Sequence, residues 1–167
     1  MQTLPFLQEN IDITALSGYK TRAFTRYYFE VRDRDDVKKL NEIFLFASEN
    51  SLPFLILGGG KNCLFAFHTY PGVIVKNMLN QWEYDIDTHI LRTDSDAEIW
   101  QIAETLENKY DTPIWHRFIG LPGSIGGAIY GNAGCFGLET GGNFSSAEVL
   151  DLESGEILTF SNEDMHF

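Results

Sequence analysis

The second half of the chain contains the uncharged stretch Leu121-Pro122-Gly123-Ser124-Ile125-Gly126-Gly127-Ala128-Ile129-Tyr130-Gly131-Asn132-Ala133-Gly134-Cys135-Phe136-Gly137. Six of these seventeen residues are glycine, and apolar residues fill most of the other positions. A flexible linker is rich in serine and polar residues instead. Glycine among apolar residues indicates a backbone that is buried and closely approached by another group.

A second glycine-rich stretch, Gly58-Gly59-Gly60-Lys61-Asn62, follows the apolar run 54–57, which is typical of a strand buried on both faces. Consecutive glycines allow successive N–H groups to converge on an anion, while Lys61 adds a cation and Asn62 a side-chain donor. The spacing matches neither a P-loop nor a Rossmann fingerprint. A tight turn between two strands is the alternative. We interpret the two stretches as one site for a large dinucleotide-like ligand.

Within the longer stretch, the spacing of Gly123, Gly126 and Gly127 predicts one turn of helix whose terminal N–H groups bind phosphate. Asn132 and Gly134 favour a turn with exposed backbone. Close packing of a glycine-rich helix against a sheet is the alternative. Cys135 is interpreted as a small apolar filler rather than a site of covalent ligand attachment. His116 and Arg117 are interpreted as a solvated loop pair.

Composition excludes several classes of protein. The chain has 167 residues and a net charge of −12, without the basic cluster that a nucleic-acid binder needs. Two cysteines and four histidines are scattered, so no metal site is expected. No apolar run is as long as a membrane span, and no signal peptide is visible, so we expect a cytoplasmic protein that contacts no membrane.

Periodicity predicts the regular elements along the chain. We expect strands at 26–31, 54–57, 63–67 and 72–75, with a turn at 70–72 between the last two. Hairpins are expected at 82–93 and 147–160. A helix capped by Asp33 or Asp35 is expected to end near Asn50, and a Ser95–Glu98 capping box is expected to begin a helix that reaches Tyr110.

This order of elements predicts an α+β fold with mixed sheets. We expect an N-terminal arm at residues 1–21, a first lobe at 22–78 and a second lobe at 79–167. The last residues give no sign of a closing element, so the last part of the second lobe is expected to be missing.

Both stretches resemble those of the UDP-N-acetylenolpyruvoylglucosamine reductase family. Residues 57–64 are similar to its Gly-x-Gly-Ser-Asn-x-Leu loop, and residues 121–137 to its Ile-Pro-Gly-x-x-Gly-Gly and Asn-Ala-Gly-x-Tyr-Gly segments. The resemblance implies a two-lobed flavoprotein of the vanillyl-alcohol-oxidase (PCMH) type with non-covalent FAD. It implies NADPH as co-substrate and a UDP-sugar substrate, reduced to UDP-N-acetylmuramate for peptidoglycan.

By this resemblance, residues 58–62 line the FAD pyrophosphate, and the residues of the second stretch that face the rest of the flavin are Gly123, Ser124, Gly126, Gly127, Asn132 and Gly134. Two positions depart from the family pattern, since Lys61 replaces a serine and Phe136 replaces a tyrosine. The family continues with an active-site segment and a substrate-binding domain where this chain ends at Phe167. No catalytic residue is therefore expected in this chain.

Without those parts we expect weak or no turnover, and self-association through exposed apolar surface. The alternatives are another flavin oxidoreductase of the same superfamily, or a FAD- or nucleotide-binding remnant without catalysis.

Overall fold

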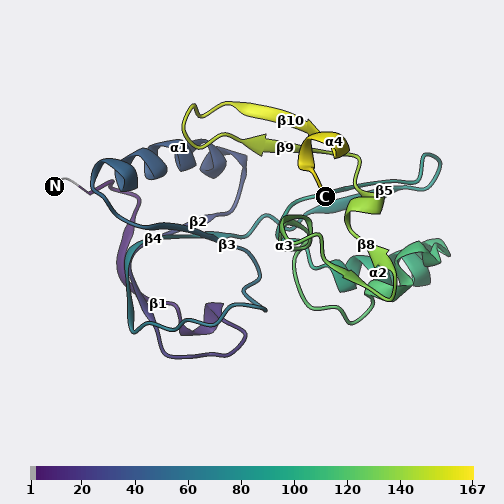
Figure 1. Ribbon diagram of the computed structural model, residues 1–167, viewed down its shortest axis with the longest axis horizontal. Helices are drawn as coiled ribbons and strands as arrows, with labels where there is room; N and C mark the ends of the chain where they lie inside the picture. The colour runs from purple at the N-terminus through teal and green to yellow at the C-terminus, as the bar shows by residue number, and fades with distance from the viewer. Residues whose placement is uncertain (1–2) are drawn as a thin grey trace. The chain divides into compact units, whose positions relative to one another are not determined.

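The computed structural model describes residues 3–167, which form two compact units (Figure 1). The first unit contains residues up to Met78 together with residues 147–160. The second unit contains residues 79–146 and 161–167. None of the helices in the described part of the chain combines the length and the apolar character that crossing a bilayer requires.

A four-stranded mixed sheet forms the centre of the first unit, which confirms the expected α+β class. Its strands, in the spatial order β1-β2-β4-β3, are β1 (Gln8–Asp12), β2 (Phe24–Val31), β4 (Thr69–Asn77) and β3 (Phe54–Leu57). Strand β1 is antiparallel to β2, whereas β2, β4 and β3 are mutually parallel. The carboxyl ends of the three parallel strands therefore lie along one edge, the usual place for a ligand in such sheets.

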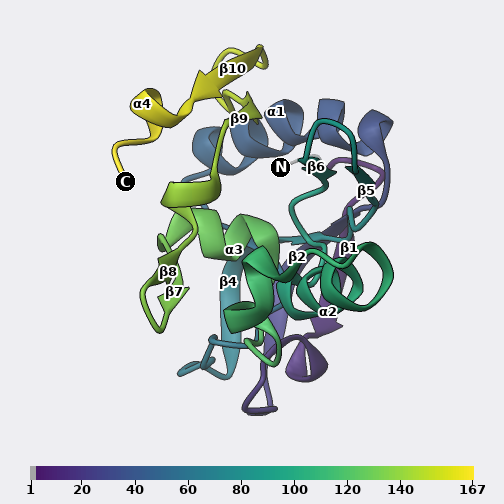
Figure 2. The ribbon, with the colours of Figure 1, turned by 90° about the vertical axis from the view of Figure 1, so that its right-hand side faces the viewer.

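Helix α1 (Arg34–Glu49) covers one face of this sheet (Figures 1 and 2). It begins as expected at Asp33, whose carboxylate accepts hydrogen bonds from the N–H groups of Asp35 and Asp36, both at 2.9 Å. Phe46, on the buried side of α1, packs edge-on against Tyr27 of β2 with ring centres 5.6 Å apart.

The hairpin of β9 (Ser146–Leu150) and β10 (Ile157–Ser161) is present as expected. It groups with the first unit, whereas the sequence placed it in a lobe spanning 79–167. The reason is a set of polar contacts between the hairpin and α1. These contacts join residues that are more than 100 positions apart in the chain. The Asn41 side chain donates to the Leu152 carbonyl at 2.9 Å, and Arg34 pairs with Glu148 at 3.0 Å.

The second unit is built around helix α2 (Ile99–Tyr110). Its other elements are β5 (Trp82–Asp85), β6 (Ile90–Thr93), η2 (Pro113–Phe118), α3 (Ile125–Tyr130), β7 (Gly134–Cys135), β8 (Leu138–Glu139), η3 (Gly141–Asn143) and α4 (Asn162–Met165). The core joins Ile102 and Leu106 of α2 to Phe118 and Ile125. The short helix α3 of the glycine-rich stretch is thereby anchored through its apolar residues.

Four expected features of the first unit are wrong. Residues 8–12 form strand β1 instead of an irregular arm, and they lack apolar alternation because the strand is mostly exposed. Residues 63–67 form no strand, and residues 70–72 are an irregularity inside β4, opposite Thr25–Tyr27, instead of a turn. Strand β3 is an outermost strand of the sheet, and its residue Ile56 is 47% exposed. The strand is therefore not buried on both faces.

The expected capping box of the second unit is also absent. Helix α2 begins at Ile99, with Glu98 at its N-cap position and no side-chain capping hydrogen bond. Ser95 instead lies in the preceding turn, where its carbonyl accepts a hydrogen bond from Gly126 at 2.7 Å. A local pattern suggested a cap, but a long-range backbone contact determines the position of this segment.

Candidate functional site

The loop Gly58–Asn62 follows β3 at the edge where the three parallel strands end. Gly59, Lys61 and Asn62 are exposed, and Gly58 is half-buried. Among the described residues, no backbone hydrogen bond of the turns and loops uses the N–H of Gly59 or Asn62. The loop therefore presents backbone donors, an amide and a cation, which is the chemistry of an anion-binding nest.

Gly60 serves the packing of this loop. Its φ of +66° is one that residues with a side chain rarely adopt, and an added Cβ would lie 1.8 Å from the Leu16 carbonyl oxygen. Its own carbonyl accepts hydrogen bonds from Gly18 at 3.0 Å and Cys63 at 3.2 Å. The buried glycine thus lets two backbone segments touch.

Glu30 of β2, like Leu57 of β3, pairs with Lys76 of β4, near the carboxyl ends of the parallel strands. The Tyr28 hydroxyl donates to Glu30 at 2.9 Å, and Glu30 also pairs with Arg32. Burial, and then the hydrogen bond to Glu30, raise the pKa of Tyr28 far above its usual value. The raised pKa favours the protonated Tyr28 hydroxyl, which donates to Glu30.

The second stretch differs from the first loop because the N–H groups at the start of its helix α3 are already hydrogen-bonded. Ser124 caps α3, since its hydroxyl accepts a 3.4 Å hydrogen bond from Gly127. The N–H of Ile125 donates to the Ala97 carbonyl at 2.9 Å and that of Gly126 to Ser95. The first-turn donors are occupied within the protein, so this helix end is not the phosphate cradle that the sequence suggested.

Gly123 and Gly127 of this stretch have room for an added Cβ. An added Cβ at Gly123, where φ is +145°, would meet no atom within 4 Å. At Gly127, which is exposed, it would meet only the Ser124 hydroxyl at 3.4 Å. At Gly126, in contrast, it would lie 2.9 Å from Ser95. Bare backbone at Gly123 and Gly127 suits the approach of a flat ligand.

Asn132 and Gly134 have internal roles in the structure. The Asn132 side-chain oxygen accepts a hydrogen bond from Gly141 at 2.9 Å, and its φ of +41° makes a turn. An added Cβ at Gly134 would lie 2.8 Å from the Leu138 carbonyl, because β7 and β8 pair there. Both residues border a shallow hollow of about 300 Å³ whose other lining residues are Cys135, Phe136, Gly137, Leu138 and Glu139.

His116 and Arg117, expected as a solvated loop pair, are exposed but lie in η2, and each contacts a different partner. His116 lies 2.6 Å from Glu107, and both are at the surface. Arg117 donates to the Phe136 carbonyl at 2.5 Å, and the Cys135 thiol contacts the Arg117 carbonyl at 2.7 Å. In the described part of the chain, no three His, Cys, Asp or Glu side chains are grouped to hold a metal ion.

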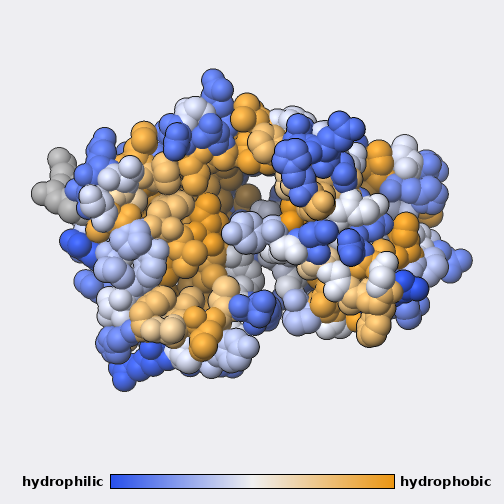
Figure 3. Space-filling view, viewed as in Figure 1, coloured by the Kyte–Doolittle hydropathy of each residue, from blue (hydrophilic) through white to orange (hydrophobic). Residues whose placement is uncertain are grey.

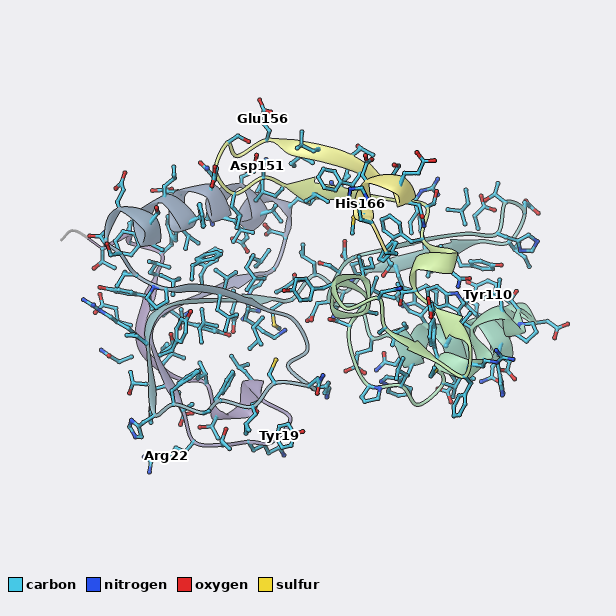
Figure 4. The ribbon with its side chains drawn as sticks, viewed as in Figure 1. Tyr19, Arg22, Tyr110, Asp151, Glu156 and His166 are labelled. Atoms are coloured by element: carbon cyan, nitrogen blue, oxygen red, sulfur yellow. The ribbon has the colours of Figure 1, made fainter. Side chains whose placement is uncertain are left out.

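Sequence reasoning missed the N-terminal arm as a neighbour of the first loop. Ser17 is buried and its hydroxyl donates to the Cys63 carbonyl at 2.6 Å. Figure 4 shows Tyr19 and Arg22, from the same segment, at the end of the first unit opposite α1. Gly18 was the available signal, because a glycine permits close approach of another group to the backbone.

The chain is similar in sequence to a known domain family and to curated enzymes. The pattern of a family described as FAD binding domain matches residues 26–161, a range that includes both glycine-rich stretches. The chain is 28% identical to the UDP-N-acetylenolpyruvoylglucosamine reductase of Chlamydia muridarum over 98% of its own length and 53% of that protein. For the enzyme of the same name from Clostridioides difficile, the identity is 31% over 82% of this chain and 44% of the relative. The chain thus spans about half the length of the curated relatives it matches.

Solved structures show the same fold. The UDP-N-acetylenolpyruvylglucosamine reductase (MurB) of Thermus caldophilus matches with a TM-score of 0.67 and 16% identity, over 95% of this chain and 54% of that one. Aclacinomycin oxidoreductase matches with a TM-score of 0.55 and 14% identity, over 89% of this chain and 31% of that one. The fold class and the family resemblance expected from the sequence are confirmed.

Proposed function

This chain belongs to the FAD binding domain family, and on that premise we propose that it binds FAD non-covalently through its two glycine-rich stretches. The family match over residues 26–161 is the observation that carries the proposal. The exposed loop Gly58–Asn62 would hold the pyrophosphate through backbone donors and Lys61. The open backbone at Gly123 and Gly127 would receive the flat remainder of the cofactor. The residues present therefore fit the group chemically.

We further propose that the protein containing this chain is an NADPH-dependent reductase that converts UDP-N-acetylenolpyruvoylglucosamine to UDP-N-acetylmuramate. The curated relatives carry that name, and the match extends over nearly all of this chain. FAD supplies the hydride chemistry when bound, while the protein supplies binding, orientation and electrostatics. The role assigned to the residues of this chain is to hold the cofactor, and none is assigned a catalytic role.

The second candidate is a different flavin oxidoreductase with the same architecture. The structural similarity to aclacinomycin oxidoreductase favours it, because that protein shares the fold without sharing the reductase name. NADPH oxidation that depends on the enolpyruvyl nucleotide sugar supports the reductase. Substrate-independent oxygen consumption by the flavin protein supports the alternative. Flavin binding without either reaction indicates a domain that only binds its cofactor.

Cofactor binding is tested by titrating the chain with FAD and following flavin fluorescence. Replacing Lys61 by alanine removes a charge-assisted contact, so the affinity for FAD is expected to fall roughly tenfold. Lys38→Ala is the matched control, because Lys38 is an exposed lysine of α1 that pairs with Asp35. Failure of the unmodified chain to bind FAD would contradict the proposal.

A further inference from the structure

We propose that Ser17 and Gly18 of the N-terminal arm are positioning residues of the cofactor site, because they hold the loop Gly58–Asn62 in the conformation that receives a pyrophosphate. This inference rests on the proposed binding of FAD. Both residues lie outside the range 26–161 that matches the FAD binding domain family. The structure nevertheless places them directly against the loop.

Ser17 anchors the end of the loop through its side chain. Only 2% of this residue is exposed, so its hydroxyl needs partners within the protein. The hydroxyl donates to the Cys63 carbonyl at 2.6 Å and accepts from the Tyr19 N–H at 3.2 Å. Cys63 is the residue that follows the loop, so this bond fixes where the chain leaves it.

Gly18 anchors the middle of the loop through its backbone. Its N–H donates to the Gly60 carbonyl at 3.0 Å. An added Cβ at Gly18 would lie 2.5 Å from the Lys61 carbonyl oxygen, so the two backbones touch without intervening side chains. The carbonyls of Gly60 and Lys61 therefore face the arm. The loop is still exposed elsewhere, at Gly59, at Asn62 and at the rest of Lys61.

This arrangement orders the loop before a ligand arrives. A loop that is already ordered loses less conformational entropy on binding than a mobile one. The arm also takes up carbonyl oxygens that would otherwise be able to face an anion. The contacts of Ser17 and Gly18 thus favour pyrophosphate binding although neither side chain is assigned a contact with it.

The test compares Ser17→Ala with Thr21→Val in titrations with FAD and with ADP. Thr21 is a matched control, because its hydroxyl also joins the arm to a backbone carbonyl, that of Phe65 at 3.1 Å, beyond the loop. We expect Ser17→Ala to lower the affinity for both ligands by roughly five- to tenfold. Thr21→Val is expected to lower it by less than about twofold. Amide hydrogen exchange without ligand is expected to accelerate at residues 58–63 in Ser17→Ala, with the sheet unchanged.

The outcomes separate the inference from the proposed function. If the unmodified chain binds neither FAD nor ADP, the proposed function is wrong. The binding role proposed for the arm is then wrong as well. If the unmodified chain binds FAD and Ser17→Ala binds equally well, the inference alone is wrong. Exchange that accelerates throughout the first unit, or equal losses of affinity in both variants, indicates general destabilisation and also overturns it.

Discussion

The two glycine-rich stretches use the same residue type for different purposes. In the loop Gly58–Asn62, the arm holds one side of the backbone and the other side is exposed. In the second stretch, the donors at the start of α3 are occupied by Ser95 and Ala97. Glycine richness alone therefore does not distinguish a backbone that faces a ligand from one that faces its neighbours. The contacts of each glycine make the distinction.

The surfaces around the two stretches share one property, which is exposed apolar side chains. Figure 3 shows apolar surface over the first unit in the view of Figure 1. Ile56 and Leu64, which flank the first loop in sequence, are 47% and 59% exposed. In the second unit, Tyr130 and Phe136 lie within the glycine-rich stretch and are 96% and 86% exposed. Both stretches thus combine bare backbone with exposed apolar side chains, which suits a ligand that has a flat apolar part and an anionic part.

The largest expected effect is that of Gly60→Ala. The new Cβ would collide with the Leu16 carbonyl, and the backbone conformation is unfavourable for alanine. We expect the free energy of unfolding to fall by about 3–5 kcal/mol. Urea denaturation measures it, with Gly142→Ala as the control because an added Cβ there would meet nothing within 4 Å. Equal stability of the two variants would contradict the packing role of Gly60.

A smaller loss is expected for Gly126→Ala in the second stretch. The Cβ would lie 2.9 Å from the Ser95 side chain and carbonyl, which forces the turn before α2 to move. The expected cost is about 1–3 kcal/mol, measured in the same denaturation experiment. A neutral result would show that the Ser95 turn adapts freely and that this glycine is not required for close packing.

Gly127→Ala sharpens the comparison within the same helix. The added methyl group meets only the Ser124 hydroxyl, and alanine is a better helix former than glycine. Stability is expected to be unchanged or to rise by about 0.5–1 kcal/mol. If the exposed backbone at Gly127 receives the flavin, the affinity for FAD falls in the same variant. Unchanged affinity would remove Gly127 from the proposed site.

The smallest effect concerns acid sensitivity of the β9–β10 hairpin in the first unit (Figure 4). Hydrogen bonds from the N–H groups of Glu153 and Ser154, followed by that from the Ser154 side chain, lower the pKa of Asp151 below its ordinary value of 3.8. This stabilising contribution is therefore present above about pH 4 and is lost as the pH falls through the folded-state pKa.

Asp151→Asn keeps an oxygen acceptor in this turn but removes the titrating charge. Thermal unfolding measured between about pH 5 and pH 2 is expected to show a weaker pH dependence in this variant. Asp87→Asn, in the turn of the other hairpin, is the control, because the Asp87 side chain accepts no hydrogen bond from the described residues. Identical pH profiles for Asp151→Asn and the unmodified chain would contradict the role of the Asp151 carboxylate.

Local patterns predicted most of the regular elements. Strand β2, helices α1 and α2 and both expected hairpins lie close to their predicted positions, because apolar periodicity and turn residues act over a few positions. The same local reasoning failed for β1, which has little apolar alternation, and for the Ser95 turn. In both cases the conformation depends on partners far along the chain, namely β2 and Gly126.

The sequence by itself determined which two segments are rich in glycine, and which family they resemble. The tertiary structure alone decided what each glycine faces. Gly60, Gly126 and Gly134 contact Leu16, Ser95 and Leu138. Gly123 faces open space, and an added Cβ at Gly127 would meet only the Ser124 hydroxyl. The physical reason is that a glycine carries no side chain to indicate its surroundings. Its role depends on which backbone the fold brings within van der Waals distance, and that follows from packing over the whole unit.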